Sequence, residues 1–170
     1  MQPLANGINR LNSTTGRLVS YLTVPLIIVV VYEVFMRYAF NAPTIWAFEA
    51  TTLMYGCHFV LGFAYTHQHN GHVAIDVFET KLSPRPRTIL RIVINLLFFV
   101  PTIGMLSFYA IRYAITSWQM LERASTSWAP PLYPFKTIMA IGFVLLFLQG
   151  IAKLIEDIKS LSNSGESSPS

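Results

Sequence analysis

The 170-residue sequence is poor in charge and almost free of cysteine. Charged residues make up only 12% of the chain and hydrophobic residues 53%, whereas an average globular domain carries about 25% charged residues. So few charges could not cover the surface of a soluble fold. The single cysteine, Cys57, excludes an intramolecular disulfide framework, and we expect it to pack within its apolar segment. The composition therefore predicts a protein surrounded largely by lipid.

The sequence also lacks the motifs of enzymes and of nucleic-acid-binding proteins. It contains no phosphate-binding loop, no dinucleotide fingerprint and no signature that pairs a nucleophile with its base. The net charge of +4 is basic, but no Lys/Arg-rich run with interleaved aromatic residues is present. We therefore expect a chain that is not an enzyme, that binds no cofactor and no nucleic acid, and whose basic charge comes from the cytoplasmic loops of a membrane protein.

Four apolar segments are long enough to cross a bilayer, since a helix that rises 1.5 Å per residue needs about 20 residues for a hydrocarbon core of about 30 Å. The sequence predicts an all-α integral membrane protein whose four-helix domain covers residues 18–156. An N-terminal segment, 1–17, precedes this domain, and a tail, 157–170, follows it and is disordered at its end. Pro25 and Pro101 predict a kink in the first and the third span. The predicted spans are residues 18–40, 45–66, 92–111 and 133–154.

The distribution of lysine and arginine predicts the orientation of the helices. Eight of these residues lie on the side that holds both termini and four on the opposite side, and the larger set is expected in the cytoplasm. Both termini are therefore predicted to be cytoplasmic, and all three tryptophans fall on the outer side. In the cytoplasmic loop, residues 72–82 mix apolar and charged side chains in a pattern that predicts a short amphipathic helix at the membrane interface.

Ionisable residues occur in the first two predicted spans. Glu33 and Arg37 have the i, i+4 spacing and the order that favour an ion pair, so we expect a structural pair or a partner contact rather than an ion or proton site. Glu49 lies one turn into the second span, where it could pair with Arg37 across the tight turn, contact a partner, or act as a functional carboxylate. His58, in the middle of that span, is expected to form a hydrogen bond between helices.

Histidines and an aspartate gather in the loop after the second span. His67, His69, His72 and Asp76 could approach a metal ion, but their spacing matches no zinc or iron signature. We therefore expect no metal in this chain. His72 and Asp76 are instead candidates for a subunit contact or for organising the hairpin.

Three blocks of residues occur in a distinctive order along the chain. The first runs from Glu33 to Glu49 and contains Arg37, Pro43 and Trp46. The second is Gly62-Phe-Ala-Tyr65 followed by Gly71-His72-Val73, Asp76 and Leu82-Ser83, and the third contains Ser117-Trp118, Glu122, Ser125, Trp128, Pro131, Tyr133-Pro134 and Lys136. In order, spacing and four-helix setting, these blocks resemble the small (Q-type) membrane subunit of tripartite ATP-independent periplasmic (TRAP) transporters, over residues 18–156.

The resemblance implies a transporter of three components in the bacterial inner membrane. In that family a periplasmic binding protein delivers an organic acid to a large membrane subunit, which holds the substrate and sodium sites and moves them in an elevator-like way by sodium symport. The small subunit adds four helices to the static scaffold and holds no cofactor, so sodium is expected in the large partner.

For the residues of this chain, the resemblance implies two kinds of contact. The first hairpin is organised, or joined to the large subunit, by Glu33, Arg37, Trp46 and Glu49. The outer loop receives the binding protein through Trp118, Glu122 and Trp128.

Two other functions stay open at the level of sequence. A small stand-alone exporter could couple an intramembrane glutamate to protons, although this chain has longer loops than such exporters. A membrane anchor of a redox complex would bind haem or quinone and could use His58, but no other predicted span contains a histidine.

Overall fold

The computed structural model describes residues 2–69 and 83–166, and in these ranges the chain is helical without a β-strand. The predicted all-α class is therefore confirmed. The helices are α1 (Gln2–Ser20), α2 (Thr23–Ala39), α3 (Ala47–Gln68), α5 (Pro84–Ile94), the π-helix η1 (Asn95–Phe99), α6 (Val100–Gln119) and α7 (Tyr133–Glu166).

Three helical runs are long and apolar enough to cross a membrane. The first joins α1 and α2 over Pro3–Ala39, the second joins α5, η1 and α6 over Arg85–Gln119, and the third is Tyr133–Leu161 in α7. The 22-residue α3 covers most of the predicted second span, but it is not among the three, since it carries Glu49, two histidines and three threonines. A fourth membrane crossing therefore stays a prediction.

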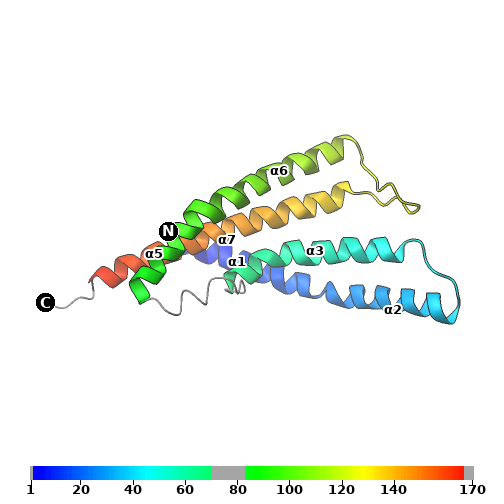
Figure 1. The fold of residues 1–170 in the computed structure, drawn as a ribbon, viewed down its shortest axis with the longest axis horizontal. Helices are drawn as coiled ribbons and strands as arrows, with labels where there is room; N and C mark the ends of the chain where they lie inside the picture. The colour runs from blue at the N-terminus through cyan, green and yellow to red at the C-terminus, as the bar shows by residue number, and fades with distance from the viewer. Residues whose placement is uncertain (1, 70–82, 167–170) are drawn as a thin grey trace.

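The helices form an elongated bundle with α7 at its centre (Figure 1). Helix α7 packs against α6, α3, α1 and α5, while α2 packs on α3. The α2–α3 and α6–α7 connections lie at one end of the bundle, which we call the loop end. The first residues of α1 and the last residues of α7 lie toward the opposite end, which we call the terminal end (Figure 1).

Pro25 interrupts the first of the three helical runs, which we call rods, as expected. A proline has no N–H for the carbonyl four residues earlier, here that of Tyr21, and its ring crowds that carbonyl. The Tyr21 carbonyl instead accepts from Val24 N at 3.2 Å, and Leu22 N donates to Val19 O at 3.0 Å, so the chain makes a tighter turn between α1 and α2. His58 Nδ1 in α3 donates to the same Val19 carbonyl at 3.1 Å. The predicted interhelical role of His58 is thus confirmed.

The π-helix accommodates Pro101 in the second rod. Val100 N donates to the Asn95 carbonyl, five residues back, so the turn before the proline contains one residue more than an α-turn. Asn95 is buried and its Nδ2 donates to the Gly150 carbonyl of α7 at 3.2 Å. Phe99 lies against Gly150, where a Cβ atom would be only 2.3 Å from Phe99 Cε1. The irregular turn therefore fits α7 closely.

Polar segments outside the four predicted spans also form helix. Residues 2–17 lie in α1, and α5 begins at Pro84, eight residues before the predicted third span. Pro84 and Pro86 lie in the first turn of α5, where a helix needs no N–H donors from these positions. The tail remains helical to Glu166. The amphipathic helix predicted at 72–82 lies outside the described residues.

The buried core is narrow. Its centre is Ala64, Leu145 and Leu146, with Phe99 and Ile103 packed against it. Helix α2 has no buried residue, and its large apolar side chains point outward along most of its circumference. Outward-facing apolar helices are stable in lipid and unfavourable in water.

Candidate functional site at the loop end

Glu33 is the centre of the α2–α3 connection. Its Oε1 accepts from Arg37 Nη2 at 2.6 Å and from Arg37 Nε at 3.1 Å, which confirms the pair expected from their spacing. Its Oε2 accepts from the backbone N of Thr44 at 3.1 Å and from the Thr44 hydroxyl. One carboxylate therefore joins the last turn of α2 to the turn that leads into α3. The Arg37 side chain is about half exposed, at 52%.

Glu49 and Trp46 connect the two loops of the loop end. Glu49 Oε2 accepts from Thr126 Oγ1 at 2.7 Å, so Glu49 binds the α6–α7 connection, and the pairing with Arg37 that we considered is not formed. The Trp46 ring stacks on Tyr32 of α2 with centroids 5.9 Å apart and lies 6.5 Å from the Trp128 ring. Residues from α2, α3 and both loops thus form one contact region.

The α6–α7 connection has a defined backbone. Leu132 N donates to Glu122 O at 2.9 Å, and Ala124 N donates to Pro130 O at 3.0 Å. Two of its residues, Leu121 and Ala129, have positive φ angles of 45° and 48°, a region that costs non-glycine residues energy. The loop also exposes the large apolar side chains of Met120 and Leu121, at 72% and 63%. These exposed residues were not predicted from the sequence.

A buried lysine holds the start of α7 to this loop. Lys136 is 5% exposed, its Nζ donates to Glu122 Oε2, and it lies 3.7 Å from the centroid of the Tyr113 ring. A buried ammonium needs such partners because it has left water. The hydrogen bond from Lys136 lowers the pKa of the Glu122 carboxyl below its ordinary value of 4.5.

This lowered pKa predicts that the loop loosens in acid. Because the folded pKa of Glu122 lies below the unfolded one, its contribution to stability is complete above about pH 4.5 and is lost as the pH falls through the folded pKa. We expect tryptophan fluorescence to report this change, since Trp118 lies beside Tyr133 in the same region. The Glu122→Gln variant should lack this acid transition. An identical pH profile for both proteins would show that Glu122 does not control the loop.

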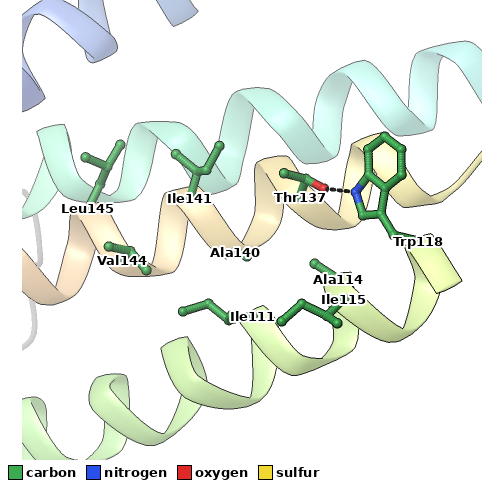
Figure 2. A pocket seen from close by; sticks show the side chains of 9 residues that line it. All are labelled: Ile111, Ala114, Ile115, Trp118, Thr137, Ala140, Ile141, Val144 and Leu145. Atoms are coloured by element: carbon green, nitrogen blue, oxygen red, sulfur yellow. Dashed lines mark hydrogen bonds between the residues drawn. The ribbon is translucent and has the colours of Figure 1, made fainter.

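An apolar groove of about 360 Å³ lies between α6 and α7 below the loop (Figure 2). Ile111, Ile115 and Trp118 line it from α6, and Ile141 and Leu145 line it from α7. At its loop end, Trp118 Nε1 donates to Thr137 Oγ1 at 2.8 Å, as Figure 2 shows. The groove therefore suits an apolar chain and offers neither a carboxylate nor an ammonium group to an ionic solute.

Two histidines of the predicted cluster, His67 and His69, have different partners in the structure. His67 stacks on Phe99 with centroids 4.4 Å apart, whereas His69 lies on Tyr65 and bonds its carbonyl through Nδ1 at 2.9 Å. Within residues 2–69 and 83–166, no three His, Cys, Asp or Glu side chains are placed to hold a metal ion. His72 and Asp76 lie outside the described residues.

The apolar helices define the class of this protein. Three long apolar rods with outward-facing apolar side chains belong to a multi-pass membrane protein. Residues 26–160 match the model of the family described as tripartite ATP-independent periplasmic transporters, DctQ component, and the chain belongs to this family. The resemblance drawn from the sequence is confirmed, and the family is a transporter component rather than an enzyme family. No curated protein sequence matches the chain.

Proposed function

We propose that this chain is the small scaffold subunit of a sodium-driven transporter that imports an organic acid across the bacterial inner membrane. It crosses the membrane four times, with both termini in the cytoplasm and the loop end in the periplasm. It stabilises a large elevator-type membrane subunit that holds the sodium and substrate sites. A periplasmic binding protein delivers the organic acid.

The observation that supports this role most strongly is how the polar side chains of the helices are used. Glu33 is occupied by Arg37 and Thr44, Glu49 by Thr126, and Lys136 by Glu122. The Glu33–Thr44, Glu49–Thr126 and Glu122–Lys136 contacts each join two elements of this chain, whereas the Glu33–Arg37 pair lies within α2. The groove between α6 and α7 is lined by apolar side chains apart from Thr137. Polar groups used in this way brace helices, and this supports a scaffold role in which the solute path belongs to the partner subunit.

The loop end is the surface proposed to receive the binding protein. Trp118 and Trp128 remain half-exposed, at 50% and 42%, and Met120 and Leu121 extend the same apolar area. Glu122 accepts a hydrogen bond from Lys136 and so holds this surface to the start of α7. Photo-cross-linkers at positions 120 and 121 should capture the binding protein, whereas one at Tyr109 on the side of α6 should not. Capture of the binding protein from position 109 but not from positions 120 and 121 would show that the loop end is not the docking surface.

Substitutions in the first hairpin test the scaffold role. We expect Glu33→Ala to lower the yield of the complex with the large subunit most, because it removes every bond of the carboxylate at once. Arg37→Ala and Glu49→Ala should each weaken the complex less, since the Glu33–Thr44 contact remains. Co-purification in mild detergent measures the effect, and Thr52→Ala, at an exposed site on α3, is the control. Full assembly and transport by all three variants would contradict the proposed role.

Transport by reconstituted vesicles tests the function as a whole. Vesicles that contain this chain alone should accumulate no organic acid under a sodium gradient. Vesicles with the large subunit and the binding protein should accumulate it, and omission of this chain should reduce uptake. Uptake by the chain alone would refute the scaffold role.

A further inference from the structure

Helix α1 carries a regular stripe of exposed leucines. Leu4, Leu11 and Leu18 are spaced seven residues apart and are 59%, 50% and 64% exposed. Each is followed by a buried residue, namely Ala5, Asn12 and Val19, which face α3 and α7. The leucines therefore lie about 100° around the helix from the packed face. They form a second apolar face that the bundle does not cover, and we call it the leucine stripe.

The leucine stripe extends beyond the reach of the bilayer. The α1–α2 rod contains 37 residues and is about 55 Å long, whereas the hydrocarbon core is about 30 Å thick. To lie wholly within that core the rod would have to tilt by about 57°, and membrane helices tilt by at most about 40°. Helix α2 is the apolar part, so α1 projects at the terminal end. Leu4 is about 21 Å farther along the rod than Leu18, and lipid tails cannot cover both.

The residues beside the leucines indicate what covers them. Apolar residues at intervals of seven on a helix form one row of a coiled-coil seam, and the residues at the intermediate positions form the second row. Gly7 and Thr14 occupy these positions, and a Cβ atom on Gly7 would meet nothing within 4 Å. Arg10 and Arg17 each precede a leucine, at the flanking positions whose charges select a partner helix. Both arginines are exposed, and neither forms an ion pair with a residue that the structure describes.

A second copy of the chain does not fit this seam. Two copies in one membrane have the same orientation, so their α1 helices would pair in parallel. Helix α1 contains no acidic residue, so the arginines of one copy would find no carboxylate on the other. Charge complementarity requires a different helix, with acidic residues beside an apolar stripe.

We infer that the leucine stripe binds a helix of the large membrane subunit that projects from the membrane at the terminal end and carries carboxylates opposite Arg10 and Arg17. This inference rests on the proposed function. Helix α1 precedes the family match at residues 26–160, so the contact lies outside the part of the chain that defines the family. It would lengthen the subunit contact beyond the membrane.

Photo-cross-linking in the assembled complex tests the inference. A photoreactive residue at position 11 or 14 should capture the large subunit, while one at Asn6, which is exposed on another side of α1, should not. Capture of phospholipid or of a second copy from positions 11 and 14 would overturn the inference. If the wild-type chain fails to co-purify with the large subunit, the proposed function fails and the inference falls with it.

Substitution of the stripe gives a second measurement. The Leu4→Ser/Leu11→Ser double variant should bind the large subunit about tenfold more weakly, which corresponds to about 1.4 kcal/mol. Arg10→Gln/Arg17→Gln should also bind more weakly and should lose the salt sensitivity of wild-type binding, because no charge remains opposite the carboxylates. Asn6→Ser is the matched control. A complex that forms normally with all these variants would refute the leucine stripe as an interface and leave the proposed function intact.

Discussion

Gly142→Ala should lower the free energy of unfolding by about 1–3 kcal/mol, because α7 and α3 touch at this position. A Cβ atom on Gly142 would lie 2.4 Å from Val60 Cγ1 and 2.8 Å from the Val60 carbonyl oxygen. The carbonyl belongs to the α3 backbone and cannot rotate away as a side chain can. The two helices would have to separate along the contact that holds α3 in the bundle.

Gly62→Ala provides a matched control on α3. The chemical change is the same, but a Cβ atom on Gly62 meets nothing within 4 Å. Alanine also favours helix over glycine by up to about 1 kcal/mol, so this variant should be as stable as the wild type or more stable. Denaturant titration in detergent, followed by circular dichroism, measures both variants. Equal stabilities would show that the close contact at Gly142 is absent.

Gln149→Leu should have the second large effect, through a buried amide network at the terminal end. Gln149 Oε1 accepts from Asn12 Nδ2 at 2.5 Å, and its Nε2 donates to Asn9 Oδ1 at 2.8 Å. Gln149 and Asn12 are each 1% exposed. The substitution leaves a buried amide without its partner, which costs about 1–3 kcal/mol.

A double-mutant cycle separates this hydrogen bond from other effects. The loss in Asn12→Leu/Gln149→Leu should be smaller than the sum of the two single losses by about 0.5–3 kcal/mol, since no unpaired amide remains between them. Asn6→Leu, at an exposed position of the same helix, should change the stability little. Strictly additive single effects would mean that the two amides do not interact.

The apolar rods could be predicted from the sequence because their cause is local. An apolar run of about 20 residues indicates a membrane helix whatever surrounds it. The Glu33–Arg37 pair and the break before Pro25 have local causes as well, namely one turn of helix and one missing N–H.

Other features depend on contacts that the sequence does not record. Asn12 is buried because α7 brings Gln149 to it, from 137 residues away in the chain. Thr126 reaches Glu49 across 77 residues. Helix α1 was missed since it is too polar to be read as a membrane span, and its buried face is recognisable only once α3 and α7 lie beside it.

The π-turn at Asn95–Phe99 also sets the rotation of α6 relative to α5 about their common helix axis. Each residue added to or removed from a continuous α-helix rotates everything beyond it by about 100°. The π-turn contains one residue more than an α-turn but still makes one turn of the helix. The extra residue therefore causes no net rotation of α6 about the helix axis relative to α5. Asn95 and Ser107 consequently both reach α7, where they donate to the carbonyls of Gly150 and Phe143. A chain one residue shorter at this turn, with an unbroken α-helix, would present the same faces to α7.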